Sequence, residues 1–183
     1  MPIAPARLRN RFDGGIHPPA QGLPDSHHRD CYLATDGSLR IDGAGMGVVA
    51  ETFEGDCIGR WSRPASTTDN NAAELLALHW GLDLLSTRIP PAASIGIIVD
   101  HEQLALGLAE AIGQSGYQFP DVPISTASEH HWGGILARIS GFRSVGVAHV
   151  PGSGNPAHPL ANARYAPVVR DRCPWSPRLS PGY

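Results

Sequence analysis

The segment SIGIIVD, residues 94–100, constrains the fold of this chain more than any other. It is the most hydrophobic strand-length run, with no polar side chain between Ser94 and Asp100. A strand that is apolar throughout is covered on both of its faces, which is typical of the centre of a sheet that lies between helices. The sequence therefore predicts an α/β domain in which this segment is a buried central strand.

Three further strands come before this segment, and turn residues separate them. They are CYLATDGS (31–38), GAGMGVVAET (43–52) and CIGRWSR (57–63). Their close spacing predicts an antiparallel meander. The segment SVGVAHV, residues 144–150, supplies a fifth strand. The predicted fold class is thus an α/β fold with a five-stranded mixed sheet, three antiparallel strands followed by two parallel ones, flanked by helices.

Helices are predicted over residues 69–86, 101–113, 129–140 and 155–166, with a loop over 114–128. Leucines recur at helical spacing in the first helix, and either Asp69 or Asn70 caps its start. In the last helix, Asn155 is the expected N-cap and Pro156 takes the first helical position, where a missing N–H costs little.

The two ends of the chain differ from this regular body. Proline-rich segments without periodicity predict a flexible N-terminal arm (1–30) and a C-terminal tail (167–183) around one domain (31–166). The N-terminus lacks the apolar run of a secretory signal, and three widely spaced cysteines form neither a zinc pattern nor a disulfide framework. We therefore expect a cytoplasmic protein, and we expect it to be a monomer that makes no contact with membranes.

The charge of the predicted body limits how it can bind nucleic acid. Residues 31–166 contain seven arginines and no lysine against thirteen acidic residues, and the two ends carry the other seven arginines. A domain this acidic cannot hold nucleic acid by a general basic surface. Divalent cations would have to help, together with the arginine-bearing tails, which we expect to contact nucleic acid or another protein.

Three acidic residues lie where predicted elements begin or end. Asp36 is at the end of the first strand, Glu74 in the first turn of the first helix, and Asp100 at the tip of the central strand. A turn, a helix dipole and a helix cap are the respective structural explanations. If the two strands are neighbours, however, the three carboxylates converge, and hard oxygen ligands of this kind suit magnesium or manganese.

The sequence also resembles the type 1 ribonuclease H family. The segments that carry the resemblance, in the family's order and spacing, are YLATDGS, GAGMGVVAE, TTDNNAAELLAL, IIVDHEQL and HVPGSGNPAHPLANARYA. They span roughly residues 31–166. The resemblance implies a ribonuclease H-like fold and an endonuclease that hydrolyses the RNA strand of RNA–DNA hybrids with two Mg²⁺ or Mn²⁺ ions.

The resemblance also assigns residues by position. The catalytic, metal-binding positions are occupied by Asp36, Glu74, Asp100 and Asn162. Positions that approach the hybrid in the family are occupied by Gly37, Ser38, Asn70 and Asn71. In the implied mechanism Asp36 bridges both ions, while Glu74 and Asp100 hold the ion near the leaving 3′-oxygen. Asn162 assists the ion that activates water.

This chain departs from the family pattern at three places. Asn162 stands where members typically carry an acid, which removes one negative charge from the site. The loop before the last helix has Gly152 and Ser153 near the position of the family's histidine. His149 and His158 flank that loop, but we favour a structural role for each. The stretch that corresponds to a basic insertion in bacterial members carries no basic residue.

Two other functions stay open at this stage. The neutral Asn162, the missing loop histidine and the acidic body favour a catalytically weak or inactive module that binds nucleic acid without cutting it. The three acids argue against that, because buried carboxylates are costly without a cation to hold. A nuclease acting on double-stranded RNA or a DNA junction is the other alternative, and the DGS and NNAAEL segments favour hybrid cleavage over it.

Overall fold

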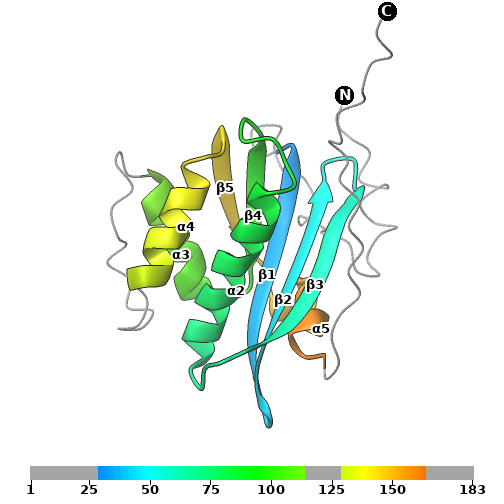
Figure 1. The fold of residues 1–183 in the computed structure, drawn as a ribbon, viewed down its shortest axis with the longest axis vertical. Coiled ribbons are helices and arrows are strands. Elements are labelled where there is room, and N and C mark those ends of the chain that lie inside the picture. The colour runs from blue at the N-terminus through cyan, green and yellow to red at the C-terminus, as the bar shows by residue number, and fades with distance from the viewer. Residues whose placement is uncertain (1–28, 114–128, 164–183) are drawn as a thin grey trace, which may run out of the picture.

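The computed structural model describes residues 29–113 and 129–163, which form one five-stranded sheet with helices on both faces (Figure 1). The strands are β1 (Cys31–Arg40), β2 (Gly43–Thr52), β3 (Cys57–Ala65), β4 (Ser94–Val99) and β5 (Ser144–His149). The helices are α2 (Asn70–Ser86), α3 (Glu102–Gly113), α4 (Glu129–Ile139) and α5 (His158–Ala161), with a 3-10 turn at Gly152–Gly154 before α5. None of the described helices is long and apolar enough to cross a membrane.

The sheet has the predicted mixed topology, in the order β3-β2-β1-β4-β5. Strands β1, β2 and β3 pair antiparallel, and β4 joins β1 in parallel, as β5 joins β4. The expected neighbourhood of the first strand and the apolar strand is therefore confirmed. The predicted loop 114–128 and most of the predicted arm and tail lie outside the described residues, but Asp30 accepts a hydrogen bond from the Ser94 backbone N–H at 2.7 Å.

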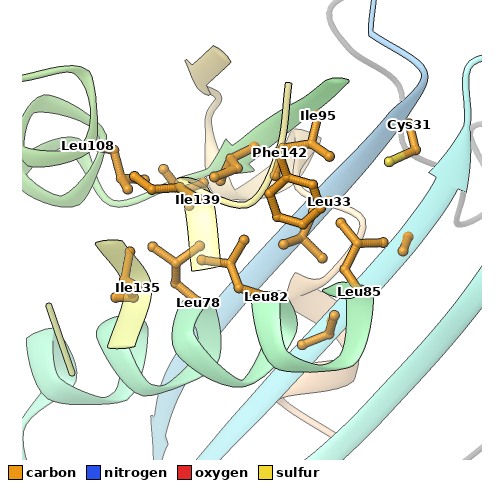
Figure 2. Close-up of a cluster of buried hydrophobic side chains, with 14 of the residues drawn as sticks. Cys31, Leu33, Leu78, Leu82, Leu85, Ile95, Leu108, Ile135, Ile139 and Phe142 are labelled. Atoms are coloured by element: carbon orange, nitrogen blue, oxygen red, sulfur yellow. The ribbon is translucent and has the colours of Figure 1, made fainter. Parts of the chain in front are cut away.

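Both faces of the central strands are buried, as the sequence predicted. On one face, Leu33 of β1 and Ile95 of β4 pack against Leu78 and Leu82 of α2, together with side chains of α3 and α4 (Figure 2). On the other face, Ile98 of β4 belongs to a smaller cluster that the loop before α5 covers. Complete burial of one leucine side chain stabilises a fold by roughly 1.5–3 kcal/mol, so the larger face dominates the stability.

Glycines in β2 allow α5 to approach the sheet backbone closely. A Cβ on Gly47 would lie 2.2 Å from the backbone oxygen of Ala157, and one on Gly45 would lie 2.1 Å from that of Ala161. No side chain fits at either position without displacing α5. The segment GAGMGVVAET is thus both a strand and the seat for a helix more than a hundred residues later.

Helix α2 begins as predicted, but Glu74 does not lie in its first turn as the sequence suggested. Asp69 is the N-cap, and its carboxylate accepts the backbone N–H of Asn71 at 2.9 Å. The helix starts at Asn70, so Glu74 lies beyond the first turn, and no acidic residue lies within that turn. The explanation of Glu74 by the helix dipole is therefore wrong, because that effect falls off within the first turn.

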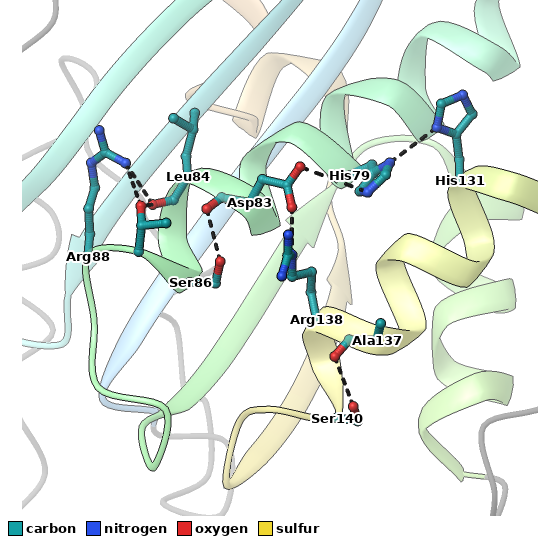
Figure 3. A network of polar contacts seen from close by, with 10 residues as sticks. His79, Asp83, Leu84, Ser86, Arg88, His131, Ala137, Arg138 and Ser140 are labelled. Carbon is teal, nitrogen blue, oxygen red and sulfur yellow. Dashed lines mark hydrogen bonds and ion pairs between the residues drawn. The ribbon is translucent and has the colours of Figure 1, made fainter.

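Helices α2 and α4 also share polar contacts on the side away from the sheet (Figure 3). Arg138 donates from Nε to the Asp83 carboxylate at 2.6 Å, and the Nδ1 atoms of His79 and His131 are 3.2 Å apart. Both members of the Arg138–Asp83 pair are about half exposed. A pair this exposed contributes little to stability, so the buried leucines beneath it hold the two helices together.

Two predicted element boundaries are wrong. Strand β1 does not end near Asp36 but continues to Arg40, because β2 pairs with it over its whole length, including Asp36 with Gly47. Helix α5 begins at His158 and not at Asn155, and only four of the expected residues are helical within the described part of the chain. Asn155 instead binds the backbone N–H of Ala157 with its side-chain oxygen, at 3.0 Å.

Candidate metal centre

Asp36 and Asp100 are brought together by the register of two parallel strands. The last paired residues of β1 and β4 are Ala34 and Ile98. Two residues further along each strand, Asp36 and Asp100 reach the same level. Side chains alternate along a strand, so both acids lie on the sheet face that carries α5. Their side chains are only 3% and 9% exposed.

Glu74 approaches this pair from the opposite face of the sheet. It is buried on α2, and one of its carboxylate oxygens accepts the backbone N–H of Gly37 at 3.1 Å. The contact requires glycine, because a Cβ on Gly37 would lie 2.1 Å from the backbone carbon of Ala73. Gly37 thus lets α2 come close enough for Glu74 to reach β1 beside Asp36.

The three carboxylates influence one another electrostatically. Burial, and then the charges of Asp36 and Asp100, raise the pKa of Glu74 to about 9. Burial and the neighbouring Asp100 raise the pKa of Asp36 to about 8. Like charges that are held together out of water resist ionisation. The three predicted acids therefore converge on one region, as their positions in the sequence suggested.

His158, at the first position of α5, completes a compact group of possible ligands. Its Nδ1 atom lies 3.2 Å from Oδ2 of Asp36 and 3.7 Å from Oδ2 of Asp100. One ligand atom from each of these three residues lies within 4.8 Å of the other two, and Glu74 is outside this trio. We favoured a structural role for His158 from the sequence, whereas the structure places its imidazole against both acids.

Asn162 enters the site through hydrogen bonds to its neighbours. Its Oδ1 accepts a hydrogen bond from Oγ of Ser38 at 2.9 Å. Its Nδ2 donates to the backbone oxygen of His158 at 3.0 Å and lies 3.3 Å from Nε2 of the same histidine. The amide therefore contacts the ring of His158 on the side away from the two acids.

The site fits a divalent cation in both charge and donor chemistry. Apart from the histidine contact, Oδ2 of Asp36 and Oδ1 of Asp100 are buried and find no hydrogen-bond partner among the described residues. Buried polar atoms are almost always paired, and leaving one unpaired costs about 1–3 kcal/mol. A cation that bound these oxygens would satisfy them and compensate the repulsion between the acids.

The residues expected to approach a hybrid lie around this centre. Gly37 and Ser38 follow Asp36 on β1, and Asn70 begins α2 on the surface. Asn71 places its side-chain oxygen 2.8 Å from Nε2 of His101. The backbone N–H of Leu104 donates to Nδ1 of that histidine, so its Nε2 carries the hydrogen and donates to the side-chain oxygen of Asn71. The amide nitrogen of Asn71 therefore stays available as a donor.

Comparison with solved structures decides the fold. An N-terminal RNase H domain from Mycobacterium tuberculosis, studied as a fusion with maltose-binding protein, is 24% identical, with a TM-score of 0.57, over 72% of this chain and 90% of that one. The chain has a ribonuclease H-like fold. RNase H1 from Halobacterium salinarum is 21% identical with a TM-score of 0.57, and LC11-RNase H1 in complex with an RNA/DNA hybrid is 20% identical with a TM-score of 0.59.

The ribonuclease H-like domain of this chain matches those two RNase H1 proteins over 72% of its own length and 94% of theirs. No protein-family model and no curated protein matches the sequence. The similarity is thus one of fold, at low sequence identity.

Two residues of the site were missed in the sequence. His158 flanks the loop where the family's histidine is expected, but the sequence favours a structural role for it; a further signal is its place four residues before Asn162, one helical turn away. Asn155 was assigned as a helix cap, but it is 3% exposed and its amide nitrogen donates to the backbone oxygen of Thr35 at 2.9 Å. That bond attaches the α5 segment to β1 immediately before Asp36.

Proposed function

We propose that this chain is an endonuclease that hydrolyses the RNA strand of RNA–DNA hybrids with the help of Mg²⁺ or Mn²⁺. The observation that carries the proposal is the pair Asp36 and Asp100, whose carboxylates meet on a ribonuclease H-like fold. Apart from the His158 contact, one buried oxygen of each has no hydrogen-bond partner among the described residues. A solved protein of the same fold, LC11-RNase H1, was captured with an RNA/DNA hybrid.

The roles of the residues follow from their positions. Asp36 and Asp100 bind the cation, while Glu74 accepts the Gly37 N–H and adds negative charge once a bound cation lowers its pKa. Asn162 adds no charge and borders the site through its hydrogen bonds to Ser38 and His158. Divalent cations, when bound, supply an activated water, alignment of the phosphodiester and neutralisation of the leaving oxygen. We assign Ser38 and the amide nitrogen of Asn71 to contacts with a hybrid whose minor groove displays 2′-hydroxyls. The Ser38 hydroxyl can accept such a hydrogen bond while it donates to Asn162.

A second candidate is a module with the same fold that binds hybrids without cutting them. The observation that favours it is the side chain of Asn162, whose oxygen already accepts from Ser38 and whose nitrogen donates to His158. An amide that is held in this way brings no charge to a cation, and it shares its oxygen with the Ser38 hydroxyl. Under this candidate the acids would hold a cation that only anchors the phosphate backbone.

One cleavage assay separates the two candidates. A labelled RNA–DNA hybrid is incubated with Mg²⁺ or Mn²⁺ and the wild-type chain, Asp36→Asn or Asn162→Asp. The nuclease proposal expects cleavage by the wild type, no cleavage by Asp36→Asn, and faster cleavage by Asn162→Asp. Asp83→Asn is the matched control, because it makes the same change on the α2–α4 surface (Figure 3), and it is expected to leave cleavage unchanged.

If the wild type and Asn162→Asp both bind the hybrid and neither cuts it, the binding candidate replaces the nuclease. If only double-stranded RNA or a DNA junction is cut, the fold acts on another substrate. Cleavage by Asp36→Asn at the wild-type rate would remove the metal centre from the mechanism altogether.

A further inference from the structure

His158 adds a nitrogen donor at the outer rim of the acidic pair. The imidazole is 47% exposed, whereas the carboxylates of Asp36 and Asp100, 3.2 and 3.7 Å from its Nδ1, are almost completely buried. The imidazole thus lies on the more exposed side of the two carboxylates and directs Nδ1 toward both of them. A cation that enters from solvent therefore meets the imidazole as well as the two carboxylates.

The loop before α5 leaves space beside these three side chains. A Cβ on Gly152 would lie 3.0 Å from Oδ2 of Asp100 and 3.9 Å from Nδ1 of His158. Any larger residue at position 152 would place carbon against the donor atoms. The glycine therefore keeps side-chain carbon away from Oδ2 of Asp100 and Nδ1 of His158.

We propose that His158 is a direct metal ligand, so that Asp36, Asp100 and His158 form a mixed oxygen–nitrogen site that selects transition-metal dications over Mg²⁺. This inference rests on the proposed function and specifies the ion that it uses. Mg²⁺ demands oxygen ligands and loses its water reluctantly. Imidazole binds first-row transition ions more strongly, and their affinity for a site with nitrogen rises from Mn²⁺ to Co²⁺.

Asn162 acts in this site as a positioning residue for His158. When Nδ1 of an imidazole binds a cation, Nε2 carries the proton and needs an acceptor. The Asn162 amide lies 3.3 Å from that Nε2, and a half-turn of the amide would present its oxygen there, at the loss of the hydrogen bond that its nitrogen now donates to the His158 backbone oxygen. Ser38, which now donates to this amide, has a hydroxyl that can equally accept a hydrogen bond. The neutral residue is thus compatible with a cation held by the histidine.

Metal affinity tests the proposal without any nucleic acid. Calorimetric titration of the full chain with Mg²⁺, Mn²⁺ and Co²⁺ is expected to give affinities that rise in that order. His158→Gln is expected to weaken Mn²⁺ and Co²⁺ by about tenfold or more while it changes Mg²⁺ little, so that the preference collapses. His149→Gln is the matched control. The His149 imidazole lies 3.2 Å from the backbone oxygen of Asp100, whereas His158 lies against the carboxylates themselves.

A spectroscopic readout tests nitrogen ligation directly. Electron spin-echo envelope modulation of the Mn²⁺-bound wild type is expected to show a ¹⁴N signal that changes to the ¹⁵N pattern when the histidines are labelled. The signal is expected to disappear in His158→Gln and to persist in His149→Gln. The labelled wild type by itself shows whether a histidine binds Mn²⁺, even if a variant fails to fold.

The positioning role of Asn162 has its own readout. Asn162→Ala is expected to weaken Mn²⁺ binding by about tenfold while the ¹⁴N signal is retained, because the ligand stays and only its support is lost. Asn162→Asp restores an acceptor for Nε2 and is expected to restore the affinity. A purely structural role for Asn162 would lower the affinities for Mg²⁺ and Mn²⁺ by the same factor.

The proposal is overturned if the wild type binds Mn²⁺ without a nitrogen signal, if it binds none of the three ions, or if His158→Gln keeps the preference over Mg²⁺. These outcomes are distinct from failure of the proposed function. A chain that binds Mn²⁺ through His158 and cuts no hybrid retains this metal site and loses the nuclease. A chain that cuts hybrids but shows no nitrogen ligand keeps the proposed nuclease function and loses the His158 metal site.

Discussion

The side chain of Asn155 donates to the backbone oxygen of Thr35 across 2.9 Å, although the two residues are 120 positions apart. Its oxygen at the same time accepts the backbone N–H of Ala157. Thr35 immediately precedes Asp36, and Ala157 immediately precedes His158. One buried amide therefore sets the distance between the strand that carries the first acid and the helix that carries the histidine.

Replacing Asn155 with alanine is expected to lower both stability and metal affinity. The change leaves the buried Thr35 oxygen without this donor, at a cost of about 1–3 kcal/mol in the free energy of unfolding. Urea denaturation measures the loss. Ser140→Ala is the control, because it removes an exposed side-chain hydrogen bond to the Ala137 oxygen. Equal stabilities for the two variants would mean that the Asn155 contact contributes nothing.

The metal-free protein is expected to lose stability as the pH rises. The folded state raises the pKa of Glu74 to about 9 and that of Asp36 to about 8, so it binds these protons more tightly than the unfolded chain does. Their contribution is complete below the ordinary carboxyl pKa values and is lost as the pH rises toward about 9.

Thermal melting in a chelator between about pH 5 and about pH 9 measures this dependence. Glu74→Gln keeps a neutral group at all pH values, so its melting temperature should fall less toward alkaline pH than that of the wild type. Saturating Mn²⁺ should flatten the wild-type profile as well. An identical pH slope for both proteins without metal would show that Glu74 ionises freely in the folded state.

Gly47→Ala is expected to displace α5 and weaken the metal centre. The new Cβ would lie 2.2 Å from the Ala157 oxygen and 2.6 Å from the Ala161 nitrogen, and both are backbone atoms that cannot turn aside. Overpacking of this kind typically costs about 1–3 kcal/mol. We expect a lower melting temperature and reduced Mn²⁺ affinity in calorimetry.

Gly133→Ala provides the contrast for that experiment. Gly133 lies within α4, and a Cβ there meets nothing within 4 Å. Alanine in a helix interior is favoured over glycine by about 1 kcal/mol, so this variant should be more stable than the wild type. If both glycine variants were stabilised, α5 would not depend on the close approach to β2.

Hybrid cleavage with Mg²⁺ is expected to require more metal in the wild type than in Asn162→Asp. The neutral amide removes one negative charge from the site, and the added carboxylate would strengthen cation binding. Cleavage rates over a magnesium titration give the half-saturating concentration for each protein. Tight saturation of the wild type at micromolar magnesium would contradict this prediction.

The local pattern of the sequence was enough to predict most of the fold. The short strand segments of β1 to β3 with turn residues between them, the leucine spacing of α2 and the apolar β4 each identify an element, because turn residues and burial leave a local trace in the chain. The end of β1 was misjudged, since the Asp-Gly pair at 36–37 is typical of a turn and only pairing with β2 keeps it extended.

The candidate site could be predicted only in part. Its acids stood out because each lies in or next to a hydrophobic element, where a charge needs a reason. His158 and Asn155 did not stand out, because each also fits an ordinary role at a helix start. The close approach of α5 to Gly47 could not be predicted either, because a glycine in the sequence does not indicate which distant segment packs against it.

The sequence by itself determined the order of the strands and helices and the acidity of the body, since these follow from local burial patterns and charge counts. The tertiary structure alone decided which side chains share one small volume. The parallel register of β1 with β4 sets Asp36 level with Asp100, and the glycines of β2 let α5 deliver His158 to them. Ligand geometry depends on distances between residues far apart in the chain, and no local pattern encodes those distances.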